Sequence, residues 1–233
     1  MSRRIAPLTG GDVARLPASC RSCLFWELGI ACQPARTGTP LGGIEVEPRP
    51  NDPVERKSAW VSERVQGGTP PGRLVEVDGE VVAYALFGPS RDFAPRATLV
   101  PHLSTDALLL ATMYVRPTHR EHGLGRVLIH AAAKEAIRLG LTGVECYVDR
   151  RWRERACLLP STWLLHEGFT VHREHPRTPL VRLDVRRLAR WSVPLEHAVD
   201  EVLARLPRRA PSPVRADASP HPDRTASLAD VGR

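Results

Sequence analysis

A glycine-bearing turn between two regular elements carries the clearest chemistry in this sequence. Gly123 and Gly125 follow an apolar run and open a segment with helical periodicity, and Arg120 and Arg126 lie at its two ends. A helix that begins at such a turn aims free backbone N–H groups outward, with the positive end of the helix dipole behind them. Glycine lacks a Cβ atom, so the backbone can approach phosphate oxygens closely, and arginine adds charge-assisted hydrogen bonds. The segment therefore predicts a pyrophosphate site.

Two other nucleotide motifs do not fit this turn. A dinucleotide-binding fingerprint needs a third glycine where Leu128 stands, and it would follow the strand without the intervening loop. A Walker-type phosphate loop ends in Gly-Lys followed by Ser or Thr, and the sequence contains no such ending. A plain turn without a ligand is the remaining alternative.

The elements that must position this turn follow from periodicity and turn residues. Asp78-Gly79 between two β-rich runs predicts a hairpin. The apolar run 107–115 predicts a central strand, and Gly140 ends the helix predicted over 125–139. We also expect a helix over 54–66 with Ala59 and Trp60 on its buried side. The remaining elements are a strand at 143–148, a helix at 157–166, strands at 169–172 and 180–185, and a helix at 195–205.

The pattern Arg-x-x-Gly-x-Gly after a strand ending in Val-x-Pro resembles the acetyl-CoA signature of the GNAT acetyltransferase superfamily. Gly168-Phe169 matches a pair that this superfamily often carries after its second helix. The resemblance implies an α/β (α+β) fold: a mixed, mostly antiparallel central sheet with a splayed central strand pair, flanked by helices. The segment from Cys20 to Glu27, Cys-Arg-x-Cys-x-Phe-Trp-Glu, also resembles an actinobacterial GNAT subgroup.

We predict four segments along the chain. The acyl-CoA-binding core spans 58–187, after an N-terminal extension at 1–57 that holds a cysteine patch and a long Pro/Gly-rich loop at 33–53. A C-terminal helix is expected within 188–206, and a disordered tail over 207–233, where Pro, Arg, Ser, Ala and Asp dominate without periodicity.

The resemblance implies which residues hold the cofactor, acetyl-CoA, as acyl donor. The backbone of Met113, Tyr114 and Val115 would pair with the pantetheine arm as an extra strand. The backbone amides from His122 to Arg126 would hold the pyrophosphate, with Arg120 at the entrance. The implied cofactor-binding residues are Met113, Tyr114, Val115, Arg120, Glu121, His122, Gly123, Leu124, Gly125 and Arg126.

Transfer of the acetyl group to a primary amine needs a proton acceptor and a stabilised thiolate. Many relatives place a tyrosine four residues before the glycine of the Gly-Phe pair, where this sequence has Leu164. Glu145 is the first candidate base, because a carboxylate within an apolar strand either faces a polar cleft or is buried at a high cost. An exposed or salt-bridged side chain is the alternative for Glu145. Glu27 is the second, and Tyr114 could serve as acid. Leu164 favours an alternative function, a non-catalytic acetyl-CoA-binding or sensing module.

The cysteine patch could suggest a zinc site, but the number and spacing of its cysteines do not favour one. Cys20, Cys23 and Cys32 supply three ligands, whereas a structural zinc site needs four. We therefore predict no metal site and expect the patch to pack against the core. Cys146 and Cys157 are distant in sequence, and a fifth, odd cysteine argues against a disulfide framework.

The composition of the chain limits its expected partners and cellular location. A net charge of +7 would suggest nucleic acid, but the arginines are scattered and Lys57 and Lys134 are the only lysines, so no nucleic-acid partner is expected. No signal peptide or membrane-spanning run is visible, which predicts a cytoplasmic protein without a membrane partner. The acceptor, a small molecule or protein amine, and the oligomeric state stay open, with a homodimer as one possibility.

Overall fold

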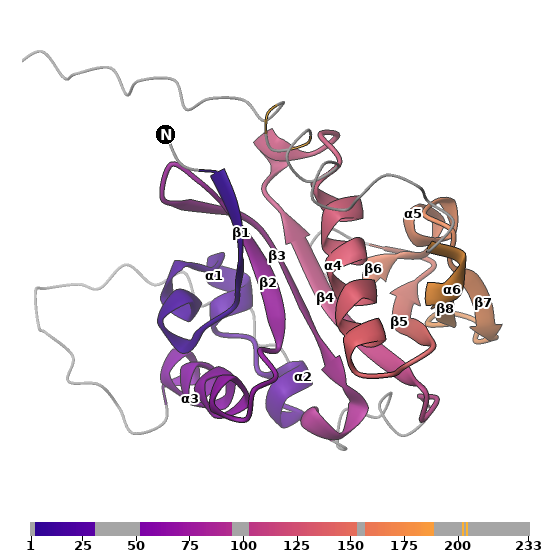
Figure 1. Ribbon diagram of the computed structural model, residues 1–233, viewed down its shortest axis with the longest axis horizontal. Helices are drawn as coiled ribbons and strands as arrows, with labels where there is room; N and C mark the ends of the chain where they lie inside the picture. Colours follow the sequence, from indigo (N-terminus) through magenta and orange to yellow (C-terminus); the bar gives the residue numbers. More distant parts are fainter. Residues whose placement is uncertain are drawn as a thin grey trace, which may run out of the picture.

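A mixed β-sheet frames the part of the chain that the structure, a computed structural model, describes. This part comprises residues 3–30, 52–94, 103–152 and 157–188, together with residues 202 and 204. The strand order is β1-β2-β3-β4-β5-β8-β7, and β6 pairs with β5 outside this path (Figure 1). The strands are β1 (Arg3–Pro7), β2 (Gly72–Val77), β3 (Glu80–Pro89), β4 (Ala107–Val115), β5 (Gly143–Asp149), β6 (Leu159–Pro160), β7 (Thr170–Arg173) and β8 (Leu180–Asp184). All described pairings are antiparallel except β4–β5 and β5–β6. The predicted mixed, mostly antiparallel sheet is confirmed.

The hairpin and the central strand form where the sequence predicts them. Asp78 and Gly79 connect β2 to β3, and both adopt a positive φ, 50° and 82° respectively. This conformation suits a two-residue hairpin turn, whose twist matches that of the flanking strands. Further along, the pairing of β3 with β4 shifts register at a bulge that leaves Ala111 without a partner in β3. A bulge bends a strand and increases its local twist.

The parallel pair β4–β5 is short and then opens. Ala107, Leu108 and Leu109 pair with Gly143, Val144 and Glu145, and the two strands share no further register. Past this point β5 pairs with β6 instead, through Val148 and Leu159. The second half of β4 therefore keeps β3 on one edge and has no described strand on the other. We call residues 107–109 of β4 with 143–145 of β5 the closed end, and residues 112–115 of β4 the open end.

Helices cover the two faces of the sheet and build two hydrophobic cores. The helix α4 (Leu124–Arg138) lies along one face of the sheet (Figure 1). There Leu128, Ala132 and Leu164 join the apolar side chains of the central strands. The N-terminal segment and α3 (Pro53–Gln66) cover the other face, with Trp26 and Trp60 in the core. The other described helices are α1 (Ala18–Arg21), α2 (Phe25–Leu28), α5 (Ser161–His166) and α6 (Val185–Leu188), and the 3₁₀ turns are η1 (Gly10–Arg15), η2 (Ser90–Asp92) and η4 (Pro117–His119). None of the helices in the described ranges has the length and apolar character needed to cross a membrane.

Three details differ from the sequence-based expectations. Strand β1 forms in an N-terminal stretch without hydrophobic periodicity, where the sequence predicts no strand. Its partner β2 lies about seventy residues away, with Ile5 opposite Val75, so no local pattern indicates this pairing. The helix predicted from Cys157 begins at Ser161, because Pro160 precedes it as the N-cap and Leu159 pairs with β5. On α3, Ala59 is exposed and Lys57 is buried instead.

Several expected segments lie outside the described residues. They include nearly all of the Pro/Gly-rich loop at 33–53, with Cys32, and the tail at 207–233. Within the helix predicted at 195–205, only Val202 and Ala204 are described, and both are helical. The division of the chain into four segments stays a prediction. Strand β1 of the N-terminal extension belongs to the same sheet as the core.

Candidate functional site

The glycine-bearing turn opens α4. The chain leaves β4 through η4 and reaches Glu121 and Gly123, both with positive φ, 65° and 81°. Gly123 is the N-cap of α4 and, as a glycine, provides no side-chain cap to this helix end. A left-handed φ is accessible to glycine at little cost, which explains a glycine at this position. The uncapped N–H groups at the start of a fifteen-residue helix form a site suited to anions.

The two flanking arginines differ in what they contact. The Arg120 Nε donates to the Val115 carbonyl at 3.3 Å, so this side chain lies beside the last residue of β4. The Arg126 Nε donates to Glu167 Oε2 at 2.8 Å, and this carboxylate raises the pKa of Arg126. The guanidinium of Arg126 is thus engaged with Glu167, whereas its backbone amide belongs to the first turn of α4. The side-chain bond to phosphate expected from Arg126 would have to compete with this ion pair.

The two glycines of the turn have different neighbours. A Cβ atom at Gly125 would lie 2.6 Å from Cζ2 of Trp163, so the indole of α5 packs directly on the backbone there. A Cβ atom at Gly123 would lie 3.2 Å from Cγ2 of Val202. Gly125 therefore permits a close approach of α5 to α4, while Gly123 permits the left-handed turn with Val202 as an adjacent apolar wall.

The open end of β4 carries the predicted pantetheine-binding residues. Met113, Tyr114 and Val115 are neither fully buried nor fully exposed, in contrast to the five buried residues that precede Thr112. The Tyr114 ring lies 6.5 Å from that of Tyr84, its cross-strand partner on β3. The Thr112 Oγ1 donates to the Cys157 carbonyl at 3.0 Å, which brings the segment before β6 next to the open end.

Glu27 lies in a buried ion pair. Its carboxylate contacts the Lys57 ammonium, and the two side chains are 1% and 3% exposed. Burial raises the pKa of the Glu27 carboxyl, and the charge of Lys57 partly opposes this effect. Lys57 Nζ also donates to the carbonyls of Cys20 at 3.0 Å and Cys23 at 2.9 Å, so one ammonium ties the cysteine patch to α3. A buried cation without such partners would be strongly disfavoured.

Glu145 lies at the closed end within a polar network. It has no exposed surface, its Oε1 accepts from Arg182 at 2.8 Å, and its Oε2 accepts from the Ser104 N–H at 2.9 Å. His172 Nε2 lies 3.6 Å from Oε1. Arg182 continues the network to Asp106, whose pKa it lowers to about 2, with help from the Thr142 hydroxyl. Both carboxylate oxygens of Glu145 therefore have partners within the protein.

The three predicted catalytic residues lie in different surroundings. Tyr114 lies opposite Tyr84 on β3, whereas Glu27 is paired with Lys57. The pKa of Tyr84 is raised well above its ordinary value, mainly by burial, and the charge of Glu27 adds to this effect. Glu145 pairs instead with Leu109, five residues before Tyr114 along β4. Leu164 has no exposed surface and packs in the core beside α4, so the position where relatives carry a tyrosine faces no cleft.

Three histidines lie on α5 and in the glycine-bearing segment 119–126, which we call the cofactor loop. His119 Nδ1 lies 2.9 Å from the Thr118 hydroxyl, and His122 Nδ1 lies 2.6 Å from the Arg120 carbonyl. Burial lowers the pKa of His119, with the nearby Arg116 adding to the effect. His166 is largely exposed beside Glu167. None of these contacts directs a histidine toward the open end of β4.

Four residues of this region escape sequence reasoning: Thr112, Cys157, Lys57 and Trp163. Their roles depend on contacts between segments far apart in the chain, such as Thr112 with Cys157. One signal was available for Lys57, since it is one of only two lysines and falls on the apolar side of a predicted helix. For the others the sequence offers no periodic or motif-based cue.

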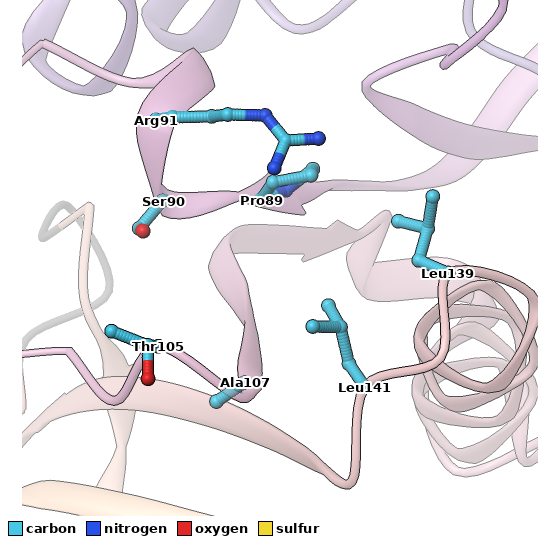
Figure 2. Close-up of a pocket in the computed structure, with 7 residues that line it drawn as sticks. All are labelled: Pro89, Ser90, Arg91, Thr105, Ala107, Leu139 and Leu141. Carbon is cyan, nitrogen blue, oxygen red and sulfur yellow. The ribbon is translucent and has the colours of Figure 1, made fainter.

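A separate pocket lies away from the cofactor loop. Figure 2 shows its lining, which comes from the end of β3, the start of β4 and the turn after α4: Pro89, Ser90, Arg91, Thr105, Ala107, Leu139 and Leu141. This is the closed side of the β4–β5 pair and the C-terminal end of α4. None of the predicted catalytic or cofactor-binding residues lines it.

Comparisons with known proteins place this architecture. A family model described as the acetyltransferase (GNAT) family matches residues 36–159. Among solved structures, YncA of Salmonella typhimurium with its cofactor acetyl-CoA has a TM-score of 0.50 at 21% identity, covering 79% of this chain and 95% of that one. The PaiA N-acetyltransferase of Thermoplasma acidophilum in complex with coenzyme A has a TM-score of 0.48 at 16% identity, covering 79% and 99%. The search of curated proteins finds no match.

These findings concern the family and the fold. At this level of identity the likeness to YncA supports the fold alone, and the comparisons do not bear on the narrower resemblance of the segment from Cys20 to Glu27. The matched residues 36–159 contain the open strand β4 and the cofactor loop, and they amount to more than half of the chain. The chain therefore belongs to the acetyltransferase (GNAT) family of enzymes.

Proposed function

We propose that this protein is an acetyl-CoA-dependent N-acetyltransferase that moves acetyl to a primary amine by direct attack on the thioester. The observation that carries the proposal is the open end of β4 beside the uncapped, glycine-containing N-terminus of α4. An unpaired strand edge suits an extended amide-containing chain, which can pair with it as an added strand. A helix N-terminus next to that edge suits the phosphates at the other end of the same ligand.

The cofactor-binding residues follow from this arrangement. The backbone of Met113, Tyr114 and Val115 would hold the pantetheine arm. The amides from His122 through Gly123, Leu124 and Gly125 to Arg126 would hold the pyrophosphate, with Glu121 shaping the turn through its positive φ. Arg120 would lie at the entrance, a position supported by its bond to the Val115 carbonyl.

Acetyl-CoA, when bound, supplies the thioester, and the side chains of this chain would manage the protons. Tyr114 is the proposed acid, since its phenol belongs to the open end and could donate a proton to the departing thiolate. Glu145 and Glu27 are the two proposed bases for the amine proton. Both side chains are buried and in ion pairs, Glu145 with Arg182 and Glu27 with Lys57, and burial raises the pKa of the Glu27 carboxyl.

The acceptor amine and any other acyl group are left open by this proposal. The direct test combines calorimetry with coenzyme A and a panel of amines assayed for free thiol in the presence of acetyl-CoA. We expect tight coenzyme A binding and thiol release with at least one class of amine. Failure to bind coenzyme A by the folded protein would contradict the proposal.

A second function, a non-catalytic acetyl-CoA-binding or sensing module, is favoured by one observation. Leu164 is buried in the core where relatives carry a catalytic tyrosine. Clear coenzyme A binding without thiol release across the whole amine panel would support this module over the enzyme.

A further inference from the structure

Two cysteine thiols from distant parts of the chain meet at the open end. The Sγ atoms of Cys23 and Cys157 are 3.5 Å apart, although the residues are separated by 134 positions. Cys23 lies between α1 and α2, Cys157 lies just before β6, and both are partly accessible and not joined in a disulfide. A disulfide bond is about 2.0 Å long, so the two sulfur atoms need to approach by only about 1.5 Å.

We propose that Cys23 and Cys157 form a reversible disulfide that closes the open end of β4 to substrates. We infer the bond itself from the contact of the two thiols. Its control of acetyl transfer rests on the function proposed above.

The backbone on both sides of the contact is anchored. Lys57, held by Glu27, donates to the carbonyl of Cys23 at 2.9 Å and so fixes the connection between α1 and α2. The carbonyl of Cys157 accepts from Thr112 at 3.0 Å, and Leu159 pairs with β5 two residues later. The thiol contact is therefore part of a defined arrangement, and closing the bond requires no large movement of either segment.

The position of the bond explains its expected effect. The Cys157 carbonyl accepts a hydrogen bond from Thr112, the first residue of the open end. Two residues later the chain forms β6, which pairs with β5. Cys23 lies near Glu27 in the N-terminal segment, which covers the face of the sheet opposite α4. A covalent link between them would tie this covering segment to the open end of β4 at Thr112. Access of the amine to the open end would then be restricted.

The chemistry balances with a low-molecular-weight disulfide as oxidant. One cysteine thiolate attacks the oxidant, which forms a mixed disulfide and releases one equivalent of small thiol that takes up the proton. The second thiolate then attacks the protein sulfur of the mixed disulfide and releases the second equivalent. The protein dithiol is oxidised by two electrons, the small disulfide is reduced to two thiols, and an excess of thiol reverses both steps.

Other cysteine chemistry is less well supported. Cys146 is fully buried, and burial raises the pKa of its thiol far above the ordinary value, which favours an inert side chain. Cys20 lies beside Tyr84 and is the one described cysteine close in sequence to Cys23. Within the described ranges no group of three or more His, Cys, Asp or Glu could hold a metal ion.

The bond itself is tested by mapping. The full chain is incubated with oxidised glutathione, remaining thiols are alkylated, and the intact mass and peptides are measured. Relative to the reduced and alkylated protein, we expect two fewer alkyl groups and one linked peptide pair, Cys23 with Cys157. The link should be lost in Cys157→Ser and retained in the matched control Cys20→Ser. A Cys20–Cys23 link, stable glutathione adducts without a link, or no oxidation would overturn the proposal.

The closure is tested without relying on turnover. Backbone amides of residues 112–115 should exchange with deuterium at least about tenfold more slowly in the oxidised than in the reduced protein, since closure reduces local opening. Cys157→Ser should show no such difference, and equal exchange rates in a fully oxidised wild type would overturn the closure. Once an acceptor is known, oxidation should lower kcat/KM for the amine, with recovery in dithiothreitol. Absence of any turnover in the reduced protein would instead count against the proposed function, and mapping and exchange would still decide the disulfide and the closure.

Discussion

The two ends of the β4–β5 pair differ in how their polar groups and backbone edges are used. At the closed end the strands share hydrogen bonds, and Glu145, Arg182 and Asp106 form a network whose charges satisfy one another. At the open end β4 has no described partner on one edge, and Thr112 and Tyr114 are partly accessible. One pair of strands thus provides a sealed half that supports the fold and an exposed half suited to binding. Burial alone does not identify a catalytic carboxylate here, because Glu145 and Glu27 are both buried and both form ion pairs.

The largest effect is expected at the closed end. Glu145→Ala leaves Arg182 with Asp106 as its remaining carboxylate, and we expect a loss of about 3 kcal/mol in the free energy of unfolding. Urea denaturation measures this loss, and coenzyme A affinity of the folded variant should be unchanged. Glu174→Ala, which removes an exposed partner of Arg150, is the control and should change stability by less than about 0.5 kcal/mol. If Glu145→Ala were as stable as wild type but had no turnover, the closed end would have a catalytic rather than a structural role, and Glu145 would be the base.

The next effect is expected at the cofactor loop. Gly123→Glu introduces a carboxylate at the anion site, where one unit charge near another costs roughly 1–4 kcal/mol, so coenzyme A affinity should fall by roughly 5-fold to 1,000-fold. Gly140→Glu is the matched control. It also replaces a glycine with positive φ, 72°, but at the opposite end of α4 with no atom within 4 Å of the added Cβ. Calorimetry on both folded variants checks the difference, and retained binding by Gly123→Glu would refute the phosphate site.

A smaller effect on the chemical step is expected from the open end. Tyr114→Phe removes the proposed acid, and kcat should fall by roughly 30-fold or more, within the range of general acid catalysis, with little change in coenzyme A affinity. Tyr84→Phe is the control, because Tyr84 faces Tyr114 across the strands but is buried. Steady-state rates of thiol release measure both. Equal rates for Tyr114→Phe and wild type would exclude Tyr114 as the acid.

The smallest effect concerns pH dependence at the closed end. Arg182 lowers the pKa of Asp106 to about 2, below its ordinary value of 3.8. A carboxyl with a lowered pKa adds stability above the unfolded-state pKa, and this contribution disappears as the pH falls from about 4 to about 2. Asp106→Asn should therefore be slightly less stable than wild type at pH 7, and the gap should narrow below pH 4. Because the Asp106 side chain is half exposed, solvent screening keeps this effect small. Thermal unfolding across pH measures the gap, and a constant gap would contradict the assignment.

Much of the fold could be predicted because its signals are local. The apolar run of β4, the Asp-Gly turn and the helix after Gly123 are each encoded within a few residues, and all three form as expected. Strand β1 could not be found this way, since five residues with partial burial become a strand only through pairing with β2. Lys57 is buried because Glu27, thirty residues away, neutralises it, and no local pattern contains that partner.

The site residues also differ in whether local sequence or tertiary contacts determine them. The cofactor loop is a contiguous motif, so its residues could be proposed from the sequence. Glu145, Glu27 and Tyr114 were chosen by residue type and position in predicted elements, and the environment of each depends on tertiary contacts. The Arg182 partner of Glu145 and the Cys157 neighbour of Thr112 come from separate parts of the chain. Side-chain environment, rather than element position, limits what the sequence can say here.

The packing of Trp163 on Gly125 has a consequence for how this motif can vary. Gly123 is tied to its backbone conformation, so its replacement is strained whatever surrounds it. Gly125 adopts no positive φ, and the indole of Trp163 is what excludes a side chain there. A larger residue at 125 is therefore compatible only with a smaller one at 163, and the two positions should vary as a coupled pair. The second glycine of this signature is thus conditional on one aromatic residue on α5, whereas the first is required by the main chain itself.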